Sequence, residues 1–166
     1  MEDITGGTPT PESAIERSMS LSNIAIFTVA LQHRRIGTTE PEDAEFLFRH
    51  WADFHFFIVA LQRLRHSAKI ATKVPKISSF VSKAINKYDT DLPFLKTMRD
   101  VGEHIDEYAF NAGRNKSIYR QQLQVGSVTG NKVFNWLDMD VDVDKAFDAA
   151  KNLFSSILEA EKIYYS

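Results

Sequence analysis

The chain has 166 residues, with 20 Lys and Arg against 22 Asp and Glu, 43% hydrophobic residues and no cysteine. A chain of this kind is typical of one globular domain, which buries roughly 70% of its unfolded surface and needs no disulfide or structural metal to fold. The absence of cysteine excludes disulfide frameworks, cysteine zinc sites, iron–sulfur clusters and thiol nucleophiles. The longest apolar run, 56–61, is far shorter than the roughly 20 residues that span a bilayer. The first residues also lack the basic start and apolar core of a signal peptide, so we expect a soluble, cytoplasmic protein with no membrane partner.

The start of the chain predicts a tail followed by a helix. Residues 1–9 have little to bury and include two adjacent glycines, which favours a disordered tail ahead of a single helical-bundle domain, 10–166. Residues 10–12, Thr-Pro-Glu, are typical of an N-cap, a first-turn proline and an acid beside the unpaired amides of a helix start. Apolar residues then recur every three or four positions, and we expect this helix to end near Gly37.

The second predicted helix is long and unusually apolar. Thr39–Glu42 has the spacing of a capping box and Val74-Pro75 breaks the pattern, so we expect a helix of about 30 residues. A helix with this much apolar surface is central in a bundle, or one of its faces contacts a partner chain. Its apolar positions at helical spacing, and the three phenylalanines that widen the stripe, are Phe46, Trp51, Phe54, Ile58, Leu61 and Leu64, with Phe48, Phe56 and Phe57.

Two further helices and a change of period follow. Helical spacing predicts a short helix over about 76–88 and a fourth helix that starts at the cap and proline of Asp89–Pro93 and ends at Asn111–Asn115. Between Ser117 and Leu137 the period changes, and a Gly-Ser-Val-Thr-Gly-Asn turn predicts a small β-hairpin. Two strands alone are marginal in water, so this hairpin must pack on the helices.

The last predicted helix completes the fold. It runs over about 143–163, with Asp142 or Asp140 as its N-cap, after an alternating acidic stretch. No internal repeat or second core is visible in the sequence. The predicted fold is therefore all-α, an antiparallel bundle of about five helices with a small β-hairpin inserted before the last helix.

Positive charge is segregated along the chain. Residues 54–88 contain seven Lys and Arg and no acid, and residues 108–137 are also free of acid. If these stretches share a face, they create a local positive potential that attracts a polyanion such as RNA despite the net charge of −2. The simpler interpretation is a solvated helix end whose cations face its C-terminal carbonyls. The candidate substrate-binding residues are Arg63, Arg65, Lys69 and Arg114.

The fourth predicted helix carries the densest group of chemically useful side chains. Asp100 and His104 are four positions apart and are expected to share a helical face, where the carboxylate fixes the tautomer of the imidazole for acid–base work. Arg99 is suited to bind a phosphate with two parallel hydrogen bonds, and His104 to move a proton at a ribose hydroxyl or leaving oxygen. Such chemistry needs no metal. Gly102 weakens the helix by roughly 1 kcal/mol relative to alanine, and close approach of another backbone is one reason for a glycine there.

Arg99-Asp100 followed after three residues by His104 resembles the Arg-polar-x-x-x-His motif of HEPN domains. HEPN domains are helical bundles in which this motif lines a cleft between two protomers. The catalytically active members are metal-independent endoribonucleases, often toxins or anti-phage effectors paired with a nucleotidyltransferase-like antitoxin. The resemblance implies a homodimer, an RNA substrate and an antitoxin partner. It makes Arg99 and His104 catalytic, with Asp100 at the polar position beside the arginine. The long N-terminal helix and the hairpin depart from a minimal HEPN pattern.

Simpler roles exist for the same residues. Arg99 and Glu103 are four positions apart and form an ion pair on a helix surface in this alternative. His104 then lies between Asp100 and Tyr108 as a structural histidine. On that interpretation the chain is a non-catalytic interaction module, with the apolar second helix docking a partner.

A metal-binding helical-bundle enzyme is the third hypothesis. Imidazole and carboxylate groups on the second and fourth helices would converge in the core. The sequence contains no Glu-x-x-His repeat of the di-iron type, so we expect neither a metal nor another cofactor. The residues concerned are His50, Asp53, His55, Asp100, Glu103 and His104.

Overall fold

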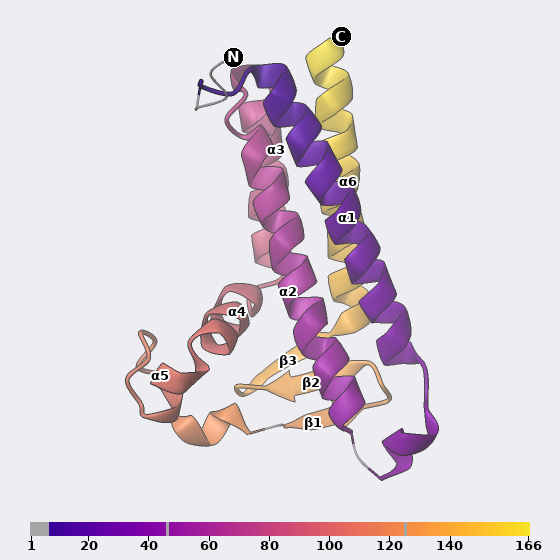
Figure 1. Ribbon diagram of the computed structural model, residues 1–166, viewed down its shortest axis with the longest axis vertical. Helices are drawn as coiled ribbons and strands as arrows, with labels where there is room; N and C mark the ends of the chain where they lie inside the picture. The colour runs from indigo at the N-terminus through magenta and orange to yellow at the C-terminus, as the bar shows by residue number, and fades with distance from the viewer. Residues whose placement is uncertain (1–6, 46, 125) are drawn as a thin grey trace, which may run out of the picture.

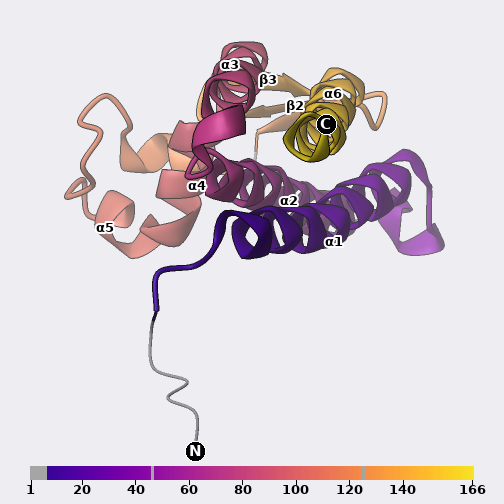
Figure 2. The ribbon, with the colours of Figure 1, turned by 90° about the horizontal axis from the view of Figure 1, so that it is seen from above.

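Four long helices form an up-and-down antiparallel bundle in the computed structural model, which describes residues 7–45, 47–124 and 126–166. These are α1 (Pro11–Gly37), α2 (Phe48–Ala71), α3 (Pro75–Asp91) and α6 (Val143–Tyr165), and α1 begins at the end of the bundle where α6 ends (Figure 1). Seen from above, α1 and α2 form one layer and α3 and α6 the other (Figure 2). The predicted helical bundle with a small β element before the last helix is confirmed.

The start and end of α1 agree with the prediction. The hydroxyl of Thr10 accepts a hydrogen bond from the amide of Ser13 at 3.2 Å, and Pro11 and Glu12 occupy the first turn. Gly37 is the last residue of the helix. Most of the predicted tail, residues 1–6, lies outside the described residues, and residues 7–9 are exposed coil.

The connection from α1 to α2 differs from the prediction in two ways: the capping box is shifted by one residue, and it caps a separate 3-10 turn instead of α2. Glu40 and Asp43, rather than Thr39 and Glu42, form the capping box, and it caps a separate 3-10 turn over Pro41–Ala44. The α2 helix starts only at Phe48 and has 24 residues. Phe46, predicted as an apolar position of this helix, lies outside the described residues.

A charged cluster fixes this connection. The guanidinium of Arg49 donates to Asp43 at 3.0 and 2.5 Å and to Asp53 at 3.2 Å, and it also donates to the carbonyl of Arg35 at 2.8 Å. The hydrogen bonds from Arg49 hold the pKa of Asp43 well below its usual range. His50 is buried against the same carboxylate, 3.2 Å from Asp43. The cluster therefore locks the end of α1 to the start of α2.

The small β element has one strand more than the predicted hairpin and forms a three-stranded antiparallel sheet. Its strands are β1 (Ser127–Thr129), β2 (Val133–Trp136) and β3 (Met139–Asp142), in the order β1-β2-β3. Part of the segment predicted as a turn is β1, and the acidic stretch supplies β3, with Val141 buried between two more exposed aspartates. Leu137 and Asp138 join β2 to β3 with φ angles of 54° and 59°, the pattern of a type I′ turn. Such turns usually carry Asn-Gly, so Leu-Asp at these positions carries no signal of a turn.

Aromatic rings join the sheet to α2. Phe134 of β2 is fully buried and stacks on Phe54 with 4.4 Å between ring centroids and 6° between planes. The edge of Trp51 meets the same Phe134 ring at 5.4 Å. Asp142 then caps α6 by accepting from the amides of Asp144 and Lys145, as predicted. The sheet is thus fixed to α2 by ring packing and to α6 by the Asp142 cap.

Two short helices lie between α3 and the sheet, α4 (Leu95–Glu103) and α5 (Ile105–Ala109), and a 3-10 turn follows at Arg120–Leu123. They project from one side of the bundle, beside the lower half of α2 (Figure 1). Tyr88 near the end of α3 is buried, and its hydroxyl donates to the carbonyl of Leu61 at 3.0 Å. This contact fixes the end of α3, and with it the start of α4, against α2. None of the described helices is both long and apolar enough to cross a bilayer.

Replacing Phe134 with alanine tests the attachment of the sheet. The substitution removes the ring stacked on Phe54 and leaves a cavity, so we expect the free energy of unfolding to fall by about 3–5 kcal/mol. Urea denaturation followed by circular dichroism measures the change. Phe110→Ala is the matched control, because Phe110 is 84% exposed and its loss should change stability by less than about 0.5 kcal/mol. Equal effects of the two substitutions would contradict the packing.

Candidate functional site

The helix that carries the Arg99–His104 motif breaks at the histidine. The prediction placed all of these residues on one continuous helix, but α4 ends at Glu103 and α5 starts at Ile105. His104 lies between them with φ −119° and ψ 34°, outside the helical region. The backbone amide of His104 still donates to the carbonyl of Asp100 at 3.1 Å, but their side chains have different partners.

The predicted pair of Asp100 and His104 is therefore not formed among the described residues. Asp100 instead accepts a hydrogen bond from the hydroxyl of Tyr108 at 2.8 Å. The Nδ1 atom of His104 lies 3.3 Å from the carboxylate of Glu107. Asp100 thus acts as an anchor for Tyr108 rather than as the partner of the imidazole.

Tyr108 ties the following loop to α4. Its ring is 1% exposed, and its hydroxyl accepts from the backbone amide of Asn115 at 3.1 Å while donating to Asp100. Burial raises the pKa of this hydroxyl above its ordinary value. A Cβ atom at Gly113 would lie 2.3 Å from the ring, so the loop needs glycine at this position. These contacts fix the loop that carries Arg114.

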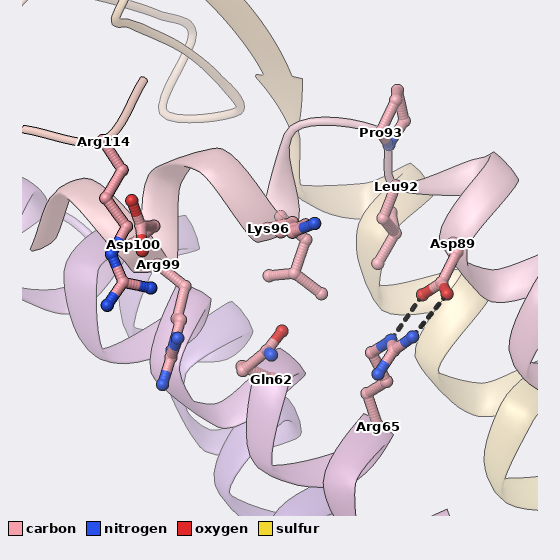
Figure 3. Close-up of a pocket in the computed structure, with 10 residues that line it drawn as sticks. Gln62, Arg65, Asp89, Leu92, Pro93, Lys96, Arg99, Asp100 and Arg114 are labelled. Atoms are coloured by element: carbon pink, nitrogen blue, oxygen red, sulfur yellow. Dashed lines mark hydrogen bonds and ion pairs between the residues drawn. The ribbon is translucent and has the colours of Figure 1, made fainter. Parts of the chain in front are cut away.

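A cleft of about 490 Å³ lies where α2, the end of α3, α4 and this loop meet (Figure 3). Four cationic and two acidic side chains line it, so it has an excess of two positive charges at neutral pH. In the view of Figure 3, Gln62 of α2 lies between Arg99 on one side and Arg65 on the other. The polar lining residues are Gln62, Arg65, Asp89, Lys96, Arg99, Asp100 and Arg114.

The four cations of the cleft differ in how they are held. Arg65 forms a bidentate pair with Asp89, with Nε–Oδ1 and Nη2–Oδ2 distances of 2.6 and 2.7 Å. Arg99 lies 2.6 Å from Glu103, and its buried Nε has no hydrogen-bond partner. Lys96 and Arg114 have no acidic partner within ion-pair distance among the described residues. Two of the four cations are thus free to neutralise a bound anion.

Burial and the positive charge around the cleft both lower the pKa of a nearby histidine, His66. The Nε2 atom of His66, which lines a groove between α1 and α2 rather than the cleft, lies 3.0 Å from the amide nitrogen of Gln62. Burial lowers its pKa, and the positive charges of Arg99, Arg65 and Lys69 lower it further. Guanidinium groups in such a potential bind phosphate oxygens with paired hydrogen bonds. The cleft is therefore suited to a phosphate or another multivalent oxyanion.

Only part of the predicted site comes together. Arg65, Arg99, Asp100 and Arg114 line the cleft. Arg63 instead lines a groove against α1, because residues two apart on a helix point to different faces. Lys69 is exposed and lines neither the cleft nor this groove, and His104 does not line the cleft.

Sequence reasoning missed three polar residues of the cleft, Gln62, Asp89 and Lys96. Lys96 precedes Arg99 by three positions and so lies on the same face of α4. That spacing could have identified it once Arg99 was chosen. Gln62 carries no charge, and only the packing of α2 against α4 brings it to the cleft.

The geometry does not support the metal-site hypothesis. His50 and Asp53 belong to the Arg49 cluster at the start of α2, where they contact charged neighbours of that cluster. His55 contacts Trp136 instead. Among the described ranges, no group of three or more His, Asp or Glu side chains converges as metal ligands would.

A Tyr108→Phe substitution tests how the loop is held. It removes the donor to Asp100 and the acceptor for the Asn115 amide, so we expect the free energy of unfolding to fall by about 1–2 kcal/mol. Hydrogen exchange at the Asn115 amide should accelerate more than exchange at the Leu61 or Tyr88 amides in the bundle. Unchanged protection of Asn115 would contradict the role given to Tyr108.

Comparison with known proteins gives no assignment. No family model matches the chain, and no curated protein or solved structure matches it. The chemistry of the cleft and of the residues around it is therefore the basis on which a function is assigned.

Proposed function

We propose that this chain is a HEPN-like protein that binds RNA, with the sugar–phosphate backbone lying in the basic cleft. The observation that carries the proposal is the convergence of Arg65, Lys96, Arg99 and Arg114 from three separate segments on one cleft, with two of them unpaired. Cations that only solubilise a surface have no reason to converge across α2, α4 and a loop. A phosphodiester chain supplies the negative charge that the cleft lacks.

The position of Arg99 links the cleft to the motif. It is the residue that the HEPN resemblance makes catalytic, and it is one of the residues that line the cleft (Figure 3). Its partner Glu103 is exposed, so a phosphate can displace that carboxylate from the guanidinium at little cost. Arg99 is therefore the residue best placed to contact a bound phosphate.

Cleavage of the bound RNA is a second candidate function, favoured by the position of His104. The imidazole is partly exposed, follows the last turn of α4, and is oriented by Glu107 at 3.3 Å. In this proposal Arg99 holds the scissile phosphate and His104 acts as general acid or base. Asp100 positions the loop through Tyr108. Because His104 does not line the cleft that Arg99 lines, the RNA must extend beyond the cleft, or a second protomer must supply the imidazole.

A non-catalytic interaction module remains the main alternative. Ile24 and Phe27 of α1 and Phe56 of α2 are exposed apolar side chains on the outer layer of the bundle. Exposed groups of this kind are typical of surfaces that bind another protein. A homodimer through this layer, and a nucleotidyltransferase-like antitoxin as a further partner, stay proposals.

Substitutions in the cleft test RNA binding. We expect the double variant Lys96→Ala, Arg114→Ala to bind a labelled single-stranded oligoribonucleotide about tenfold more weakly, measured by fluorescence anisotropy. The slope of log affinity against log salt should fall by about 0.7 for each phosphate that the variant no longer neutralises. The control Arg63→Ala, Lys69→Ala removes the same charge outside the cleft and should have a much smaller effect. Equal losses in the two double variants, or affinity that does not depend on salt, would contradict the proposal.

His104→Ala tests cleavage separately from binding. We expect the wild-type chain to cleave structured RNA in the presence of a chelator. His104→Ala should lose at least about a hundredfold in rate, the scale of general acid–base catalysis. The same variant should retain RNA affinity within about twofold, whereas Arg99→Ala should lose both. Full activity of His104→Ala would overturn the catalytic role, and binding without cleavage by the wild type would leave an RNA-binding protein.

A further inference from the structure

A second cavity, of about 350 Å³, lies on the other side of Arg99 from the basic cleft. It is bounded by α2, by α4 with the first residue of α5, and by β2. Val59 and Ile105 at its rim are 44% and 48% exposed, and Trp136 is buried. Arg99 lines both cavities, so the two are neighbours that share this residue. Its other principal lining residues are His55, Val59, Met98, Gly102, Ile105 and Trp136.

Apart from Arg99 and Glu103, which form an ion pair with each other, the residues that line this cavity carry no fixed charge, and such a lining suits a flat, uncharged ring. The edge of the His55 ring meets Trp136 with 4.9 Å between centroids and 87° between planes. Partial desolvation against the neighbouring aromatic rings lowers the pKa of His55, which disfavours the charged imidazole. Met98 adds a polarisable sulfur, a group that makes favourable contacts with aromatic rings.

Gly102 keeps the cavity open. Glycine weakens the interior of a helix relative to alanine, and a reason is needed for its presence in α4. A Cβ atom built at Gly102 meets no other atom within 4 Å, so no close approach of this chain's own backbone requires it. A side chain at this position would instead extend into the second cavity, which Gly102 lines.

We propose that this second cavity is a nucleobase subsite, and that it holds one unstacked base of the RNA whose phosphate lies in the basic cleft. The inference rests on the proposed RNA binding. Its volume falls in the range of small-molecule sites, which is roughly 300–1,000 Å³. Arg99 can contact the phosphate on one side and the plane of the base on the other, as guanidinium groups do. RNA-binding proteins recognise single strands through splayed bases stacked on aromatic and arginine side chains.

The test compares RNA with and without bases. The probes are a short oligouridylate and an abasic ribose–phosphate chain of the same length, titrated against the full chain. We expect the wild type to bind the oligouridylate at least about fivefold more tightly, the lower end of the gain from stacking one base. Gly102→Leu fills the cavity with a better helix former, and should reduce oligouridylate affinity to that of the abasic chain.

Gly102→Ala is the matched control, since one methyl group in open space should change neither affinity by more than about twofold. Equal wild-type affinity for both probes would overturn the base subsite and leave the basic cleft in place. If neither probe binds the wild type, the RNA proposal is overturned, and the subsite with it. A third outcome is that the wild type is a dimer by sedimentation, and that Gly102→Leu makes it a monomer without changing its preference for the oligouridylate. That outcome would assign the cavity to a second copy of the chain and contradict the subsite.

Discussion

Burial of α2 on several sides at once is the constraint on which the rest of the molecule depends. This helix packs against α1, α3, α4 and α6 and receives the sheet through the Phe54–Phe134 stack. The positions of these four helices and of the sheet are therefore set by their contacts with α2. The side chains of α2 that escape burial between these neighbours include Gln62 and Arg65 on the basic cleft and His55 on the second cavity. Both candidate sites are consequences of how the central helix is covered.

The break at His104 separates the Asp100 carboxylate from the His104 imidazole, two groups that a continuous helix would have placed side by side. It frees Asp100 to bind Tyr108, and this hydrogen bond brings the loop with Arg114 back onto α4. The same break removes the imidazole from the carboxylate that was predicted to tune it. The cleft thus acquires a cation from a distant segment, while the histidine stays at the end of the turn. Phosphate binding is in consequence better supported by the geometry than proton transfer.

Local patterns were sufficient to predict the helices and insufficient to predict their breaks. The Thr10 cap, the proline at position 75 and the Asp142 cap follow from rules that involve only neighbouring residues, and each helix boundary they define is observed. The late start of α2 depends instead on Arg49 reaching Asp43 and the carbonyl of Arg35. In the site, the charges of Arg65, Arg99 and Arg114 were visible in the sequence, but their convergence required Tyr108 to fold the loop. Arg63 was chosen on charge alone, and its helical phase directs it elsewhere.

The bidentate pair of Arg65 and Asp89 has a consequence for how a ligand is received. Two of the N–H groups of the guanidinium are committed to the carboxylate, and the remaining ones are left for an incoming anion. The rotamer freedom of this long side chain is therefore lost when α2 and α3 come together during folding, before any ligand arrives. Association then carries a smaller entropic penalty at Arg65 than at the untethered Lys96 and Arg114. The cleft thus combines one side chain that is fixed in advance, Arg65, with two that can change conformation, Lys96 and Arg114. Such a cleft accommodates a bent polymer better than a cleft whose side chains are all rigid.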